Sequence, residues 1–350
     1  MESYFYYHFS FVVLLISCLV MLLPTRNKYL MFTFGERSTF LLMIIVSIIL
    51  GSLPIKEIYS DRFLYAQLIS AAHNNILAKP DSDLFFYYYI KFAGSILSPS
   101  AWMYLTAFIY TFNNFVFSKK IGGSYLYPVF LMFITGFFFY AYGVNTIRAG
   151  LAISFLLLAL AYYDKLIYFV IFLLIAINIH FSMIIPVTAI LLSKYFCKTR
   201  LYLFVWLMSI PLSAAMGHSF ENFFASMSSD YRISYLSVDP DQTHYNIGFR
   251  IDFILYSCIP VFMGYYYIFK REIRDNLYLI LYNTYILANC FWILVIRANF
   301  SDRFGYLSWF IYPAVLIYPA LKYKLWDNQN QKITLIIFLH GLFTYIMFLK

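Results

Sequence analysis

Long apolar runs recur along the whole chain, and they constrain its fold more than any other feature. A helix that crosses a bilayer core needs about 20 apolar residues, with a range of roughly 17 to 25. Of the 350 residues, 63% are hydrophobic and 12% are charged, whereas a soluble domain carries roughly 25% charged residues. These values exclude a disordered chain, a secreted disulfide scaffold and a conventional soluble enzyme. The sequence therefore predicts an all-α integral membrane protein.

The apolar runs predict a polytopic helical bundle of about 12 transmembrane segments in a single domain over residues 1–350. Within 166–193, a turn at Asn178-Ile179-His180 is expected, because only a turn there leaves Lys165 and Lys194 on the same side of the membrane. The predicted segments are 5–23, 39–55, 100–118, 125–143, 149–163, 166–180, 182–193, 201–217, 251–269, 277–296, 304–321 and 333–349.

Basic residues gather in one set of loops, which hold 15 Lys and Arg against five Asp and Glu. The positive-inside bias assigns those loops to the cytoplasm and both termini to the outer side. The net charge of +9 is thereby explained by topology, and we predict no nucleic-acid partner. Two outward loops are long, 56–99 and 218–250. The aromatic stretch Leu84–Leu97 in the first of them predicts a helix lying at the membrane interface.

Two outward polar side chains are predicted to lie at the same depth. Arg148 begins one span and His180 ends the next. From Arg148 to Asp164 the helix descends about 24 Å, and from Lys165 to His180 it climbs back roughly 22 Å. A snorkelling arginine and a carbonyl-bonded histidine would each be unremarkable alone. Their matched height favours a shared site at the outer rim.

Further arginines lie on the same predicted side. Arg303 begins a late span, and Arg232 and Arg250 lie in the second long loop. A surface ion pair with Asp302 would account for Arg303 equally simply. Arginine suits phosphate because its planar fork donates two parallel hydrogen bonds and stays charged. With Arg148, these residues predict a site for a diphosphate presented at the membrane surface.

Metal and cofactor signals are weak. Asp81-Ser82-Asp83 and Asp239-Pro240-Asp241 have the D-x-D form that can hold a divalent ion against a nucleotide-sugar diphosphate, but the pattern is short and common. The four cysteines follow no metal-ligand spacing. We predict no metal and no cofactor. Outward tyrosines, including Tyr65 and Tyr231, are candidates for stacking on sugar rings.

Several motifs follow one another along the chain: outward Asp61 and Tyr65, an acidic stretch leading into an aromatic helix, Asn145-x-x-Arg148, His180-x-Ser182, Ile185-Pro186 and Arg303-Phe304. Their order and spacing resemble the EpsG family of bacterial polysaccharide polymerases, which are related in role to the Wzy O-antigen and capsule polymerases. The resemblance spans roughly residues 10–320. One departure is Ala149, where many members carry Gln after the arginine.

The resemblance implies a GT-C-like bundle in the bacterial inner membrane with its active site on the periplasmic side. The implied reaction transfers a glycan chain from undecaprenyl diphosphate to the non-reducing end of another undecaprenyl-diphosphate-linked repeat unit. Membrane lipids, a chain-length regulator and a flippase are the expected partners. An O-antigen ligase is the nearest alternative, and a lipid-linked oligosaccharide flippase is the second.

Candidate roles can be assigned on this basis. Fixed guanidinium groups stabilise charge on a leaving diphosphate without a metal. The acceptor hydroxyl needs a base, for which His180 is the first candidate and Asp61 the second. The diphosphate is assigned to Arg148, Arg303, Arg232 and Arg250, and the sugars to Tyr65, Asn145, Ser182 and Tyr231.

Overall fold

The computed structural model describes residues 2–22, 35–80, 82–216, 218–226, 248–298 and 301–349. Within these ranges all the regular secondary structure is helical. The chain divides into two compact units, one made of Met1–Met183 and Ile317–Lys350 and the other of Ile184–Leu316.

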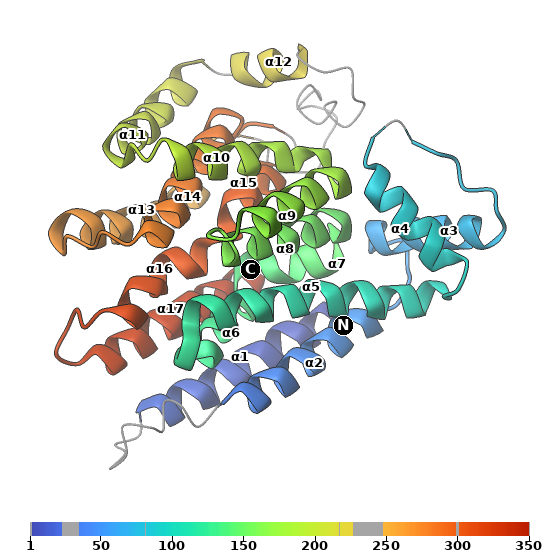
Figure 1. Ribbon diagram of the computed structural model, residues 1–350, viewed down its shortest axis with the longest axis horizontal. Helices are drawn as coiled ribbons and strands as arrows, with labels where there is room; N and C mark the ends of the chain where they lie inside the picture. Colours follow the sequence, from blue (N-terminus) through green and yellow to red (C-terminus); the bar gives the residue numbers. More distant parts are fainter. Residues whose placement is uncertain are drawn as a thin grey trace. The chain divides into compact units, whose positions relative to one another are not determined.

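Among the described residues, the first unit contains helical elements from the N-terminal half of the chain together with the last helix (Figure 1). These are α1 (Glu2–Leu22), α2 (Glu36–Ser52), α3 (Ser60–His73), α4 (Leu84–Gly94), α5 (Pro99–Gly122), η2 (Gly123–Tyr125), α6 (Leu126–Ile134), α7 (Phe137–Val144), α8 (Ile147–Ala161), α9 (Leu166–Ile179), η3 (Phe181–Met183) and α17 (Gln329–Leu349).

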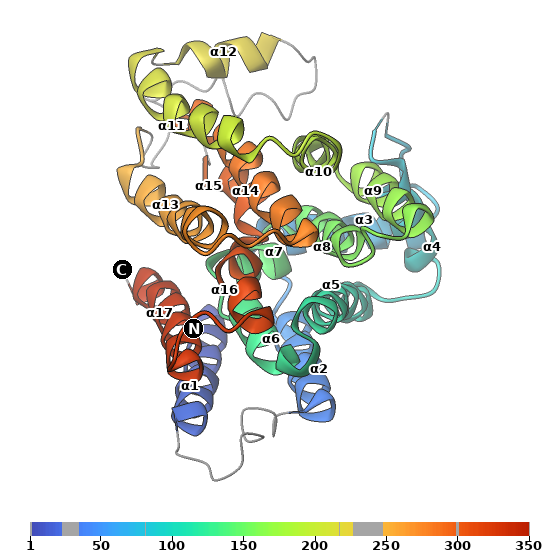
Figure 2. The ribbon, with the colours of Figure 1, turned by 60° about the vertical axis from the view of Figure 1, so that its left-hand side comes forward.

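Helices α1 and α17 are far apart in sequence but lie side by side (Figure 2). Their contact is aromatic: Phe11 stacks on Tyr345 with ring centroids 3.9 Å apart, and Tyr7 stacks on Phe348 at 4.1 Å. The order of these pairs along the two helices makes them antiparallel. Offset aromatic pairs contribute about 0.5–1.5 kcal/mol beyond the area that they bury, so this contact ties the two ends of the chain together.

The segment 125–143, which the sequence predicts as one span, is interrupted. Helix α6 ends at Ile134, and the helix resumes only at Phe137. Gly136 has an extended backbone, and a Cβ at this position would meet the carbonyl oxygen of Phe133 at 3.1 Å. The run Pro99–Ile134 and helix α7 are bent by 70° at this break. A helix-period apolar pattern does not reveal such a bend.

The second unit is built around α14, against which α10, α11, α13 and α15 pack. Helix α16 crosses the boundary between the two units. The elements are α10 (Ile184–Tyr195), α11 (Thr199–Met216), α12 (Ser219–Ser226), α13 (Ile251–Tyr265), η6 (Tyr266–Lys270), α14 (Asn276–Leu294), α15 (Ser301–Trp309) and α16 (Tyr312–Lys322).

A buried amide holds the helices of the second unit together. Asn289 of α14 accepts from the Trp206 indole at 2.8 Å and donates to the hydroxyls of Ser257 and Ser308 at 3.1 and 3.0 Å. These partners lie on α11, α13 and α15. A buried polar group stabilises a fold when its hydrogen bonds are made, so Asn289 fixes the arrangement of four helices.

In the described residues, six helices are long and apolar enough to cross a membrane, or seven if the bent pair forms one span. The chain is therefore a helical membrane protein, with fewer long apolar helices than the predicted segments. The difference comes from short helices at several predicted positions, among them Ile147–Ala161, Leu166–Ile179 and Phe181–Tyr195. The six are Tyr4–Leu22, Thr199–Met216, Ile251–Lys270, Asn276–Leu294, Ser301–Lys322 and Gln329–Leu349.

Candidate functional site

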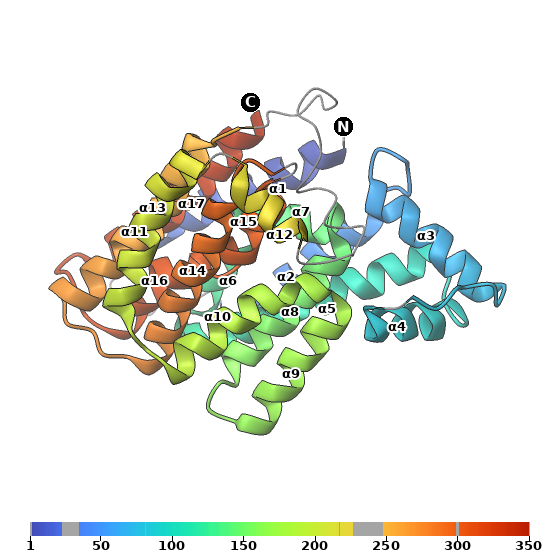
Figure 3. The ribbon, with the colours of Figure 1, turned by 90° about the horizontal axis from the view of Figure 1, so that it is seen from above.

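Helices α8 and α9 form an antiparallel hairpin, which fixes the geometry of the candidate site (Figure 3). Phe155 faces Phe172 with ring centroids 6.3 Å apart. Extending this register by about two turns brings Arg148, in the first turn of α8, level with His180, the residue that follows the last turn of α9. Arg148 and His180 therefore lie at the same end of the hairpin.

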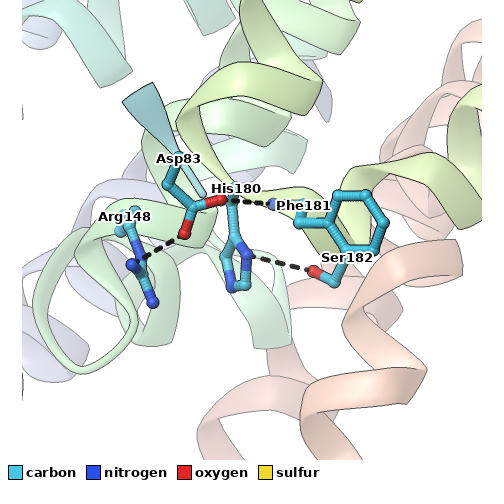
Figure 4. A network of polar contacts seen from close by, with 5 residues as sticks. All are labelled: Asp83, Arg148, His180, Phe181 and Ser182. Atoms are coloured by element: carbon cyan, nitrogen blue, oxygen red, sulfur yellow. Dashed lines mark hydrogen bonds and ion pairs between the residues drawn. The ribbon is translucent and has the colours of Figure 1, made fainter. Parts of the chain in front are cut away.

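Asp83 joins these two helix ends (Figure 4). One carboxylate oxygen accepts from a guanidinium nitrogen of Arg148 at 2.9 Å, and the other accepts from the backbone N–H of Phe181 at 2.9 Å. The Asp83 side chain is only 4% exposed. One buried carboxylate thus connects the start of α4, the start of α8 and the turn after α9.

The local backbone of Asp83 explains how it reaches both partners. Asp83 precedes α4 and has φ 57° and ψ 41°, in the left-handed region. Aspartate tolerates this region better than most residues, because its short polar side chain makes local hydrogen bonds. The next turn begins the aromatic helix α4, which packs against α3 and α9.

Asp83 binds the Arg148 guanidinium through one nitrogen and leaves another of its N–H groups without an acceptor in the described part of the chain. The Arg148 side chain is 24% exposed, and its guanidinium lies 5.8 Å from the centroid of the Phe86 ring. The ion pair with Asp83 uses Nη1. Its Nε is buried and has no hydrogen-bond partner among the described residues. A buried N–H without an acceptor costs about 1–3 kcal/mol, so this edge of the fork is suited to an anionic oxygen.

His180 is a partly exposed residue with an extended backbone at the end of α9. Its Nδ1 lies 3.4 Å from the Ser182 hydroxyl. In Figure 4 the imidazole lies beside both the Asp83 carboxylate and Ser182. The hydrogen bond from the Phe181 N–H to Asp83 fixes the backbone next to this ring. The predicted His180–Ser182 pair thus lies in the same cluster as Arg148.

Asp61 and Tyr65 of α3 extend the cluster. Asp61 accepts the backbone N–H of Ile147 at 3.0 Å, which caps the start of α8. Burial raises the pKa of the Tyr65 phenol, and the neighbouring Asp61 charge and a hydrogen bond to Asp61 raise it further. Tyr65 is 4% exposed and packs against the rings of Phe86 and Trp102. Little of its ring is therefore accessible to a sugar.

Arg62, which follows Asp61 on α3, has a structural role. Arg62 is 1% exposed and donates to the carbonyls of Leu50, Gly51 and Leu53 at the end of α2. Helix ends leave such carbonyls without intrahelical partners. Arg62 is thus a structural cap that anchors the first turn of α3, and Asp61 with it, against α2.

Arg303 and Arg250 belong to the second unit. Arg303 is a partly exposed residue in the first turn of α15. Arg250 precedes α13, forms a two-pronged pair with Asp252 at 3.0 and 2.7 Å, and lies over the Phe253 ring at 4.0 Å. Asn145 is exposed at the end of α7. Arg232 and Tyr231 lie outside the described residues.

The central role of Asp83 was not predicted from the sequence, which considered this residue only as part of a D-x-D metal motif. Asp81 lies outside the described residues, and Asp83 is engaged with Arg148 and Phe181. In the described part of the chain, no group of three or more His, Cys, Asp or Glu side chains is placed to hold a metal ion. An aspartate directly before an aromatic helix was the available signal.

Comparison with known proteins gives one finding. The family model described as "EpsG family" matches residues 38–350, which includes every residue of the cluster described above. Searches of curated proteins and of solved structures returned no match.

Proposed function

The chain belongs to the EpsG family, and from that premise we propose that it is a polysaccharide polymerase of the glycosyltransferase class. Its donor would be a glycan on undecaprenyl diphosphate, and its acceptor the non-reducing end of another lipid-linked repeat unit. The observation that carries the proposal is the cluster formed by the start of α8 and the turn after α9. There a partly exposed arginine with an unused buried N–H lies beside a histidine.

The proposed reaction is a displacement at the anomeric carbon. A base takes the proton of the acceptor hydroxyl, whose oxygen then forms the new glycosidic bond. The bond from the anomeric carbon to phosphate oxygen breaks, and the lipid diphosphate leaves with the electron pair. Charge develops on that phosphate, where a fixed guanidinium stabilises it more in the transition state than in the ground state.

Arg148 is the residue proposed to receive this charge. Asp83 holds its Nη1, and the Nε edge is left for a phosphate oxygen. The guanidinium plane suits two oxygens of one phosphate better than a lysine ammonium does. Arg303, Arg250 and Arg232 remain proposed partners for the second phosphate and for closing the site.

His180 is the base we favour over Asp61. The Asp61 carboxylate already accepts the Ile147 N–H and hydrogen-bonds to Tyr65, so it serves as a helix cap. An imidazole has an ordinary pKa near neutrality, which suits proton transfer at physiological pH. Asn145 and Ser182 are retained as proposed sugar contacts.

The finer setting is also a proposal. We place the protein in the bacterial inner membrane as a GT-C-like bundle of about 12 segments, in which short helices such as α8 and α9 complete the crossings. The α3–α4 hairpin would lie at the periplasmic interface, where exposed Tyr88 and Phe92 of α4 suit the headgroup region. A flippase that supplies repeat units and a chain-length regulator are the expected partners.

The decisive experiment is deletion of the gene, with the surface glycan separated on a gel. A polymerase deletion leaves single repeat units attached, whereas a ligase deletion leaves long polymer on the lipid carrier. A flippase deletion would leave repeat units on the cytoplasmic side. Retention of long attached chains in the deletion strain would refute the proposal.

Complementation of the deletion strain with variants tests the proposed role of Arg303. Arg303→Ala should accumulate in the membrane and restore no long chains, because a diphosphate held by one guanidinium alone loses charge stabilisation. Full restoration by Arg303→Ala would remove Arg303 from the site and leave the role of Arg148 standing.

A further inference from the structure

Asp83 has an arrangement that a simple surface ion pair does not require. Its two oxygens bind different elements: one takes the Arg148 guanidinium and the other the N–H that follows His180. The two contacting residues, Arg148 and Phe181, are 65 and 98 positions from Asp83 in sequence. Because the side chain is 4% exposed, water competes little for these bonds.

We propose that Asp83 is the positioning residue of this site, holding the Arg148 guanidinium and the His180 backbone in one fixed arrangement. This inference rests on the proposed function, because it assigns Asp83 to the same reaction. The leaving diphosphate and the acceptor hydroxyl then meet groups whose separation is already set. Fixed placement of reacting groups is a large part of catalysis, and a misplacement of 1 Å can lower a rate by about a hundredfold.

Asp83 itself is a poor candidate to take the acceptor proton. Each oxygen already accepts a hydrogen bond from the protein, and the side chain is 4% exposed. The charge of Asp83 also opposes, to some extent, the binding of a second anion at Arg148. Because Asp83 weakens the binding of an anionic substrate to Arg148, its place in the site is best explained by its orientation of Arg148 and of the backbone beside His180.

The backbone of Asp83 supplies a clean variant. Asparagine tolerates the left-handed region as aspartate does, so Asp83→Asn keeps the shape, the turn and an oxygen for the Phe181 N–H. It removes the charge that holds Arg148. The matched control is Glu36→Gln, which breaks the ion pair with Lys119 between side chains that are 58% and 51% exposed. Such exposed pairs contribute little.

The experiment uses the purified full-length protein in lipid nanodiscs and three measurements. Chain elongation of lipid-linked repeat units is followed at saturating substrate, undecaprenyl diphosphate binding is followed by intrinsic tryptophan fluorescence, and thermal unfolding is monitored in parallel. For Asp83→Asn we expect elongation to fall at least about tenfold, from loss of placement. Undecaprenyl diphosphate affinity should stay within about threefold of wild type, because the lost anchor and the lost repulsion oppose each other.

A second readout separates positioning from a merely structural role. In an Arg148→Lys background, Asp83→Asn should lower elongation by less than about threefold, because its effect acts through the Arg148 guanidinium and residues that act as a unit are not additive. Glu36→Gln should leave all three measurements unchanged.

Each other result overturns the assignment. Wild-type elongation by Asp83→Asn would show that the anchor is not needed. A full tenfold loss on top of Arg148→Lys, or failure of Asp83→Asn to accumulate, would assign the carboxylate to folding alone. If the wild-type protein itself neither elongates lipid-linked units nor binds undecaprenyl diphosphate, the proposed function fails, which is a different outcome from failure of the Asp83 variant alone.

Discussion

Two corners of the molecule combine a buried carboxylate with an arginine, and they use the arginine differently. In the first unit, Asp83 binds one nitrogen of Arg148, and the buried Nε of Arg148 keeps no partner among the described residues. In the second unit, the buried Glu221 accepts the backbone N–H of Arg297 at 3.1 Å. This hydrogen bond uses the backbone of Arg297, and its guanidinium has other partners.

Arg297 directs its guanidinium to the end of a helix. It donates to the carbonyls of Ser213 and Ala214 in the last turn of α11, at 2.6 and 3.3 Å, and lies 5.1 Å from the centroid of the Phe249 ring. Cations near a helix C-terminus stabilise it by about 0.3–1 kcal/mol. An arginine bound to carbonyls stabilises the fold, whereas one bound through a single nitrogen still has donors for a ligand. The position of arginines in the sequence does not distinguish the two kinds.

The largest effect expected from this difference comes from replacing each of the two arginines, Arg148 and Arg297, by lysine. Arg148→Lys keeps the charge and loses the planar fork, and we expect elongation to fall on the order of a thousandfold, as when an arginine that stabilises transferred phosphate is lost. Its thermal unfolding should change little. The measurement is elongation of lipid-linked repeat units per folded protein, alongside melting of the same samples.

Arg297→Lys should show the opposite pattern. Loss of its hydrogen bonds to the α11 carbonyls should lower the free energy of unfolding by about 1–3 kcal/mol, while elongation per folded protein stays near wild type. Equal losses of activity and stability in both variants would erase the distinction between the two corners.

A smaller effect is expected at the imidazole. His180→Gln keeps a polar group of similar size and removes the base, so elongation should fall about a hundredfold, within the usual contribution of general-base catalysis. Undecaprenyl diphosphate binding should be retained, because the phosphate is assigned to Arg148. Elongation at half the wild-type rate or more would transfer the role of base to another group, with Asp61 the next to test.

The sequence was sufficient for much of this corner, for a simple geometric reason. Arg148 begins the first of two consecutive short apolar helices and His180 follows the end of the second. The rise of 1.5 Å per residue therefore places both at the same end of the hairpin without any knowledge of packing. The break at Gly136 and the helix α3 were not foreseen. A glycine with an extended backbone leaves the apolar pattern of 125–143 unchanged, and α3 lies in a segment whose charges had suggested a loop.

The role of Asp83 could not be obtained in the same way. Its contacts connect residues from three elements, and they depend on a left-handed backbone at one position. Local propensity permits that conformation for aspartate but does not require it. Sequence reasoning placed the two ends of the hairpin together and missed the carboxylate between them, because long-range pairing is decided by tertiary packing.

The smallest expected effect separates capping from catalysis at Asp61. Asp61→Ala removes the acceptor for the Ile147 N–H at the start of α8, and loss of such a cap costs about 1 kcal/mol. That corresponds to a decrease of roughly 2–4 °C in the melting temperature of a chain of 150–250 residues, and somewhat less in this longer one. Asp61→Asn keeps an oxygen acceptor and should melt closer to wild type.

Both Asp61 variants should elongate within about threefold of wild type, because a cap that shifts α8 slightly acts on Arg148 only indirectly. If Asp61→Asn melts normally and yet makes no long chains, the carboxylate is the base, and the proton then leaves the acceptor toward α3 instead of toward the α9 turn.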